Sequence, residues 1–282
     1  MIRQSPGAAS MNSRTPLAEV YDINSTRRVR AVGYSWPDVD SCRKYFGQRV
    51  TGRLKQGDGS EFLRSYLERM PDTGFSLTRL RIEAVQNKPP RDWEVGEAFA
   101  ESVLEDYFDC LFPWPTSRDQ REKEGHATGP DLPGYHVPVA KPARFAFGEV
   151  KSSSQKASPP AVVSGVDGKG GKETLVGQLR RLLTEPARRQ TLIAWLGFRE
   201  TREAEGSTRF DSAFKWYGES GECLIAGCLV SGKRAVSKAD LADAHSALEA
   251  NLCGHELWLF AFYLPFEKVD WPSLISQKGE QS

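Results

Sequence analysis

The spacing of apolar residues along the chain predicts an alternation of helices and strands. Between residues 93 and 112, apolar residues recur at three- and four-residue steps, the pattern of a helix with one buried face. Short runs that are apolar throughout predict strands fully buried in a sheet, and they cover 191–198, 223–230 and 256–265. Further helices are expected over 173–183, 210–216 and 238–250, the last with Ser237 as its cap. This order indicates an α/β sandwich with a central mixed sheet.

The N-terminal part of the chain is less regular, and Pro89-Pro90 breaks it from the rest. Short helices over 38–46 and 61–70 and a strand over 75–85 predict an N-terminal α+β extension. We therefore expect four parts: a disordered leader over 1–16, an accessory or partner-docking region over 17–90, the main domain over 91–275 and a flexible tail over 276–282. Residues 153–172, rich in Ser, Gly and Lys, are expected to form a mobile loop within the main domain.

Composition and charge exclude several classes of protein. The chain has 38 Lys plus Arg and 37 Asp plus Glu, a net charge of +1, so nucleic-acid binding would depend on a local basic patch. No apolar run approaches the roughly 20 residues that a membrane span needs. The five cysteines are scattered, and the N-terminus carries no apolar leader. We expect a cytoplasmic protein with reduced thiols and no membrane contact.

Two further strands are predicted over 135–140 and 144–152, and the second has an unusual face. Because side chains alternate along a strand, Phe145 and Phe147 share one face with Glu149 and Lys151. A charge at the end of a buried strand costs free energy unless it is paired or bound to a metal. Glu149 and Lys151 can satisfy this condition by pairing with each other or with solvent, which is the structural alternative to a catalytic role.

A catalytic role becomes attractive because Asp131 precedes this strand. Cleavage of a phosphodiester builds negative charge on the phosphate, and divalent cations counter it while lowering the pKa of a bound water. Mg²⁺ prefers a few hard oxygen ligands. Asp131 and Glu149 would supply two carboxylates and Val150 a carbonyl oxygen, while Lys151 would contact the attacking water or the phosphate.

A third carboxylate for this site is expected from the 93–112 helix. Glu97, Glu101 and Glu105 are spaced by four residues and therefore lie on roughly one face. Glu97, near the start of the helix, is preferred over Glu101, and Glu105 is not chosen.

Three segments together resemble the PD-(D/E)xK nuclease superfamily, which has the restriction-endonuclease-like fold. They are 96–101 (GEAFAE), 129–132 (GPDL) and 147–151 (FGEVK), and the resemblance spans about residues 93–200. It implies an α/β/α sandwich and an endonuclease dependent on Mg²⁺ or Mn²⁺, with Asp131 and Glu149 as metal ligands and Lys151 as the catalytic lysine. Some branches add a supporting Gln on the next helix, here Gln178, but their following Tyr is replaced by Leu182.

The chain is also similar to the nuclease subunit of Hachiman-type anti-phage systems, which works beside a separate helicase. Residues 165–172 (GVDGKGGK) lack the spacing of a phosphate-binding loop, so an ATP motor would have to be another chain. The resemblance therefore implies a defence effector that cleaves DNA with a helicase partner. One chain carries one active site, so cutting both strands would need two copies, as in a homodimer, or two events. The alternative is a catalytically inactive subunit on the same fold that binds nucleic acid or a protein. Lys156, Lys169 and Lys172 are the candidates for contacting nucleic acid.

Overall fold

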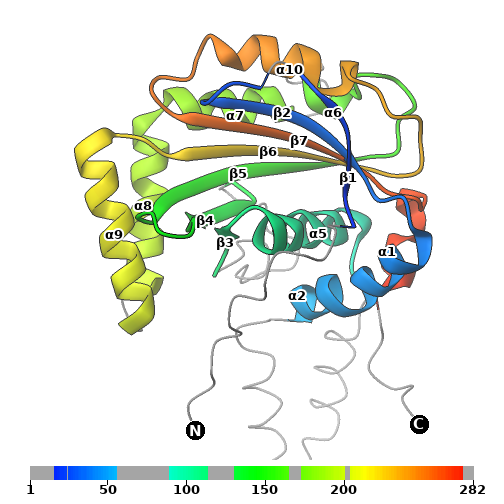
Figure 1. The fold of residues 1–282 in the computed structure, drawn as a ribbon, viewed down its shortest axis with the longest axis horizontal. Helices are drawn as coiled ribbons and strands as arrows, with labels where there is room; N and C mark the ends of the chain where they lie inside the picture. The colour runs from blue at the N-terminus through cyan, green and yellow to red at the C-terminus, as the bar shows by residue number, and fades with distance from the viewer. Residues whose placement is uncertain are drawn as a thin grey trace, which may run out of the picture.

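The computed structural model describes residues 16–23, 25–55, 89–113, 130–164, 173–200 and 204–275. Within them, seven strands form one sheet in the order β1-β2-β7-β6-β5-β4-β3 (Figure 1). β2, β7, β6 and β5 are parallel, whereas β1, β4 and β3 run antiparallel to their neighbours, so the predicted mixed sheet is confirmed. The strands are β1 (Ala18–Asp22), β2 (Val29–Ser35), β3 (Cys110–Leu111), β4 (Leu132–His136), β5 (Arg144–Ser153), β6 (Leu224–Ser231) and β7 (Glu256–Tyr263).

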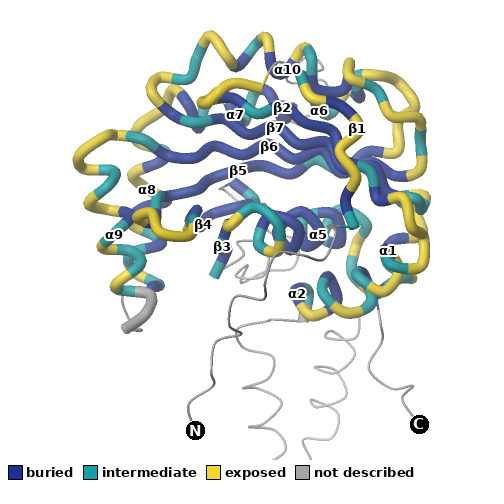
Figure 2. Tube along the Cα trace, viewed as in Figure 1, coloured by how far each residue is buried: buried dark blue, intermediate teal, exposed yellow. Residues whose placement is uncertain are grey.

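Helices cover both faces of this sheet. One layer holds α1 (Val39–Tyr45), η1 (Phe46–Val50), α2 (Thr51–Lys55), α5 (Asp92–Tyr107) and η3 (Lys268–Leu274). The other holds α6 (Ala161–Ser164), α7 (Leu175–Thr184), α8 (Pro186–Glu200), α9 (Ala204–Ser220) and α10 (Ala239–Glu249). Alternation along the strands separates two cores, since Ala146 and Val150 pack beneath α5 while Phe145 and Phe147 pack on the α7 side. β2, β4, β5, β6 and β7 are buried almost throughout, whereas the edge strand β1 is largely exposed (Figure 2). No helix in the described part of the chain is long and apolar enough to cross a membrane.

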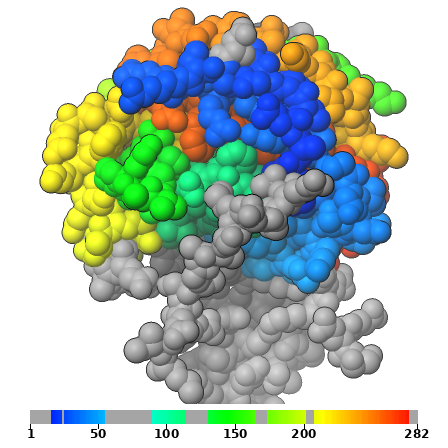
Figure 3. Space-filling model, viewed as in Figure 1, coloured from blue at the N-terminus to red at the C-terminus, as the bar shows by residue number. Residues whose placement is uncertain are grey.

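The described part of the N-terminal region belongs to this same body. β2 pairs in parallel with β7 from Val29↔Leu257 to Ser35↔Tyr263, and β1 adds to its outer edge. In the space-filling view the blue N-terminal segment lies directly against the orange C-terminal part of the chain (Figure 3). A boundary near residue 90 therefore does not separate residues 17–55 from the main domain. The predicted helix over 61–70, the strand over 75–85, the tail over 276–282 and all of the leader except Pro16 lie outside the described residues.

One predicted strand is wrong. Residues 191–198 form part of the helix α8. Within this run Leu192, Ile193 and Leu196 are buried, whereas Phe198 is 64 % exposed. The burial follows a helical period, so one face packs on the core and the other faces solvent. A short run of apolar residues does not reveal this difference, because a buried strand and a helix with large side chains on both faces look alike over eight positions.

Several other boundaries differ from the predictions. α5 ends at Tyr107, and β3 begins at Cys110 within the range predicted as helix. β4 covers Leu132–His136 and not 135–140, because its pairing with β5 ends at His136↔Arg144. Residues 153–172 were expected to be loop, but β5 includes Ser153 and α6 occupies Ala161–Ser164. α10 begins after Lys238, without the predicted side-chain cap from Ser237.

Gly96 allows α5 to lie directly on the sheet. A Cβ atom at this position would overlap the Oγ atom of Ser152 on β5 and would lie 3.2 Å from the ring of Trp271. The backbone of α5 therefore approaches β5 at the point where a side chain has no room. This close approach sets the position of Glu97, the next residue in the helix.

We predict that Gly96→Ala lowers the free energy of unfolding by about 1–3 kcal/mol, because the added methyl group must displace Ser152 or Trp271. Gly218→Ala is the matched control, since Gly218 also lies in a helix but has nothing within 4 Å of a built Cβ atom. That control should be more stable than the parent by about 0.5–1 kcal/mol, because Ala favours a helix. Urea unfolding of both variants tests this, and an equal gain in stability for both would contradict the close contact.

Candidate functional site

β5 extends beyond its neighbour β4, and this leaves part of one strand edge open. The pairing of the two strands begins at Leu132↔Gly148, whereas β5 continues to Ser153. Asp131 directly precedes β4 and turns its carboxylate onto this open edge. Its Oδ2 atom accepts a hydrogen bond of 2.9 Å from the backbone N–H of Val150. A side-chain carboxylate thus takes the place of the next strand partner.

Pro130 explains why the pairing stops here. If the register of β4 and β5 continued, Pro130 would face Val150. Proline has no N–H group and so cannot donate a ladder hydrogen bond to the Val150 carbonyl. In antiparallel pairing, the N–H and C=O groups of one residue point to the same edge. The Val150 carbonyl therefore lies on the edge where the Asp131 carboxylate binds the Val150 N–H.

The two predicted acids converge at this edge. The Asp131 carboxyl group binds the backbone of Val150, the residue after Glu149, and the charge of Glu149 acts on it. The Nζ atom of Lys151 lies 2.7 Å from Oε1 of Glu149, so the amine lies beside the acids as well. The pKa of Asp131 is raised well above its ordinary value, first by burial and then by the nearby negative charges of Glu149 and Glu97. Asp131, Glu149 and Lys151, which are separated in the sequence, thus lie together at the open edge of β5.

Glu97 is the helix glutamate that joins these groups. Burial, followed by the charges of Glu101 and Glu149, raises the pKa of Glu97 to about 8, and the charge of Lys151 opposes this rise. The electrostatic influence runs in both directions, because Glu97 also raises the pKa of Asp131. Glu97 is thus close enough to the open edge of β5 for the charges of Glu149 and Lys151 to act on it, and its role in the site stays a prediction.

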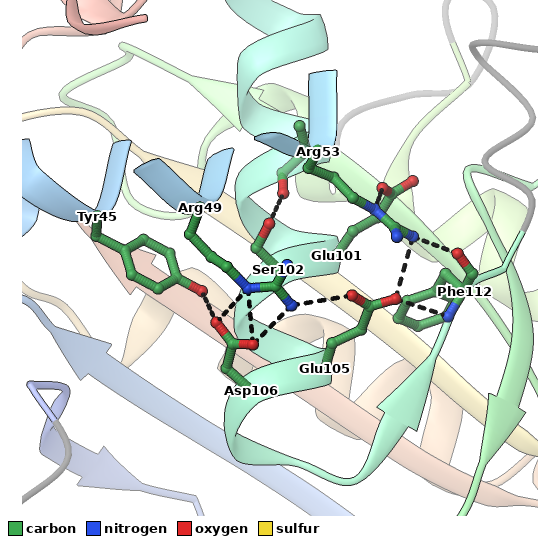
Figure 4. A network of polar contacts seen from close by, with 9 residues as sticks. Tyr45, Arg49, Arg53, Glu101, Ser102, Glu105, Asp106 and Phe112 are labelled. Carbon is green, nitrogen blue, oxygen red and sulfur yellow. Dashed lines mark hydrogen bonds and ion pairs between the residues drawn. The ribbon is translucent and has the colours of Figure 1, made fainter. Parts of the chain in front are cut away.

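Glu101, one turn further along α5, is bound elsewhere. It is 1 % exposed, and its Oε2 atom lies 2.6 Å from Nε of Arg53 (Figure 4). Arg53 also lies 3.2 Å from Oε1 of Glu105 and donates to the carbonyl of Phe112. A second arginine in the same network, Arg49, pairs with Glu105 and Asp106. Glu101 thus helps to hold α2 against α5 and is not turned toward Asp131.

The donor set at the open edge suits a hard divalent cation. Asp131 and Glu149 bring two carboxyl groups to this edge, the charge of Glu97 acts on Asp131 from α5, and the amine of Lys151 supplies one positive charge. Partly buried acids that repel one another are stabilised by protonation or by a cation. Asp131, Glu149 and the Val150 carbonyl would offer the oxygen ligands that Mg²⁺ prefers. Within the described residues, no group of three or more His, Cys, Asp or Glu side chains is arranged to hold a metal ion.

Gln178 lies on the helix that covers the neighbouring strand. Leu175 and Leu179 of α7 pack over Gly227, which is the partner of Glu149 in the β5–β6 register. The Oε1 atom of Gln178 is buried and has no hydrogen-bond partner among the described residues, so this acceptor is available to a ligand or a water. Lys156 is exposed on the segment after β5, and Lys169 and Lys172 lie outside the described residues.

Lys268 also lies near the candidate site, and no pattern in the sequence indicates it. Its Nζ atom lies 3.4 Å from the carbonyl of Ser152, the residue after Lys151, and 3.3 Å from Oδ2 of Asp92. Lys268 lies near the C-terminus in a segment of mixed apolar and charged residues, 264–272 (LPFEKVDWP), with no motif around it. No pattern in the sequence places it near β5, because only the packing of η3 against α5 brings it there.

Comparisons with known proteins do not identify this chain. No protein-family model, no curated protein and no solved structure matches it. A function is therefore inferred from the residues of the site and from their arrangement.

We predict that Arg53→Met lowers the free energy of unfolding by about 3–5 kcal/mol, because it leaves the buried Glu101 carboxylate without this partner. The double variant Arg53→Met/Glu101→Leu should be less destabilised than the sum of the two single variants, since it removes both charges. Arg28→Met is the control, because Arg28 pairs with Glu222 at the surface, where its side chain is 57 % exposed. This control should change stability by less than about 1 kcal/mol. Additive losses in chemical denaturation would contradict the coupling of Arg53 to Glu101.

Proposed function

We propose that this chain is a Mg²⁺- or Mn²⁺-dependent nuclease that hydrolyses DNA phosphodiester bonds. The observation that carries the proposal is the convergence of Asp131 and Glu149 at the open edge of β5, with the Lys151 amine 2.7 Å from Glu149. Two acids and an amine at the end of a buried strand have little structural value, because apolar residues would fill the same space at a lower cost in free energy. This arrangement suits an anionic substrate and a cation.

The residues divide the chemistry as follows. Asp131, Glu149 and the Val150 carbonyl would hold the cation. When bound, the cation would lower the pKa of the attacking water and screen the negative charge that develops on the phosphate. Lys151 donates a hydrogen bond to that water or to the phosphate. Glu97 would support the cluster from α5. On the α7 side, the Oε1 atom of Gln178, which has no partner among the described residues, would accept a hydrogen bond from a bound water or ligand. Phe145 and Phe147 precede these residues on the same strand, and their buried side chains exclude water from that part of β5.

The order of elements around the site supports a restriction-endonuclease-like fold. A helix (α5), an antiparallel pair (β4 and β5), a further helix (α7) and a parallel strand (β6) occur in this order, with β3, α6, α8 and α9 between them and the acids at the end of the pair. We extend the proposal to an effector subunit of a prokaryotic anti-phage system that works in the cytoplasm with a separate helicase. Its support is the resemblance of the GE, GPDL and GEVK segments, together with the lack of a phosphate-binding motif in the chain.

We predict that the purified chain, or its complex with a helicase, nicks plasmid DNA in the presence of Mg²⁺ or Mn²⁺ and that EDTA stops the reaction. Glu149→Gln and Lys151→Gln should each lower the rate at least about 100-fold, because each removes a group that acts on the reacting phosphate or water. The matched controls are Glu219→Gln and Lys215→Gln, exposed residues on α9 that should leave the rate unchanged. Cleavage by both site variants at the parent rate would reject the proposal.

The second candidate is an inactive subunit on the same fold that binds nucleic acid or a protein. The specific observation in its favour is that Glu149 and Lys151 already form an ion pair, which neutralises both groups without a cation. The first candidate requires cation binding at this pair, whereas the second does not.

Metal binding separates these two candidates. We predict that titration calorimetry detects binding of Mn²⁺ to the parent chain and that Asp131→Asn abolishes it, because the variant loses one of the two carboxylate ligands. Asp211→Asn, at an exposed position on α9, should bind Mn²⁺ like the parent. A chain that binds DNA without binding Mn²⁺ would favour the inactive subunit.

A further inference from the structure

The open edge of β5 extends past the candidate metal ligands. Val150 and Ser152 present their backbone groups to the same edge, because residues two apart along a strand point the same way. The Asp131 carboxylate binds the N–H of Val150, and the Lys268 amine lies 3.4 Å from the carbonyl of Ser152. Two residues advance a strand by about 6.8 Å. The positive charge of Lys268 therefore lies beside the same edge, two residues beyond Val150 toward the C-terminal end of β5.

Lys268 is held in this position from several sides. Its Nζ atom lies 3.3 Å from Oδ2 of Asp92 at the start of α5, and its side chain is 18 % exposed. Its backbone nitrogen is in close contact with Gly232, whose own N–H donates to the carbonyl of Ser153. Trp271, fully buried, fixes the rest of η3 against Gly96. An ion pair, a backbone carbonyl and packed neighbours thus hold the amine in place, unlike a solvated lysine on the surface.

We infer that Lys268 binds a backbone phosphate of the nucleic acid, next to the phosphate that is cleaved. This inference rests on the nuclease function proposed above and adds a substrate-binding residue to it. A strand lying along the open edge would place one phosphate beside Asp131, Glu149 and Lys151 and a neighbouring phosphate beside Lys268. The ammonium group of lysine binds phosphate as a point charge, and a sheltered position strengthens this attraction.

Asp92 gives a means to separate this role from a structural one. If Lys268 only joins η3 to α5, removal of either partner of the Lys268–Asp92 pair has the same effect. If Lys268 binds phosphate, only Lys268→Gln weakens the binding of nucleic acid. Lys268→Gln removes the positive charge, whereas Asp92→Asn breaks the same ion pair and leaves the positive charge more available to an anion.

The experiment measures binding of the full chain to a fluorescein-labelled DNA duplex by anisotropy, in EDTA so that no cleavage occurs, at several salt concentrations. Lys268→Gln should weaken binding about tenfold and reduce the slope of log affinity against log salt by about 0.9, the value for one lost phosphate contact. Asp92→Asn should bind as tightly as the parent or more tightly. Lys268→Arg should restore the slope, and Lys238→Gln, an exposed lysine at the start of α10, should not change it.

Each outcome supports or overturns the inference. An unchanged slope for Lys268→Gln, in a chain that binds DNA, would overturn it and leave the nuclease proposal intact. Equal losses of affinity for Lys268→Gln and Asp92→Asn would also overturn it in favour of a structural role. No binding of DNA by the parent chain would instead count against the nuclease proposal. In cleavage assays, Lys268→Gln should raise KM more than it lowers kcat, because Lys268 lies beside the reacting groups and is not one of them.

Discussion

The hydrogen bond from the Val150 N–H to the Asp131 carboxylate organises the whole site. It ends the pairing of β4 with β5 and attaches the Asp131 side chain to the edge of the neighbouring strand. Pro130 makes this ending necessary, because it cannot donate the next ladder hydrogen bond. The two strands therefore diverge at the point where Asp131, Glu149 and Lys151 come together. Without this divergence, backbone pairing would cover the edge on which the acids and the Val150 carbonyl lie.

Glu97 and Glu101 lie one helical turn apart on α5, but their surroundings differ. Glu101 is buried against Arg53, and the pair ties α2 to α5. Glu97 lies among other acids, and its pKa rises to about 8 as a result of burial and of the charges of Glu101 and Glu149. A paired acid serves the fold, whereas an acid that is raised in energy by its neighbours is one that a cation can stabilise. The same helix thus anchors the domain through Glu101 and carries the candidate site residue Glu97.

The sequence predicted much of this arrangement because its signals were local. The alternation in β5 placed Glu149 and Lys151 on one face, and the helical period of α5 limited the third acid to Glu97, Glu101 or Glu105. Local signals failed where two structures share a pattern. The apolar run in α8 suits a strand or a helix equally well, and β1 and β2 lie in a segment that carried no clear period. Both were decided by the partners available in three dimensions.

The sequence by itself determined the chemistry of the site, since the residue types and their spacing along the chain fix which oxygen and nitrogen atoms can be offered. Tertiary structure alone decided which of them meet. Parallel pairing of β2 with β7 places the N-terminal strands in the sheet. The ion pair with Arg53 holds the Glu101 carboxylate away from Asp131. The packing of η3 against α5 brought Lys268 to Ser152, which is 116 positions away in the sequence. These contacts join residues that are distant in sequence, and burial of side chains on a shared core brings them together without any local pattern.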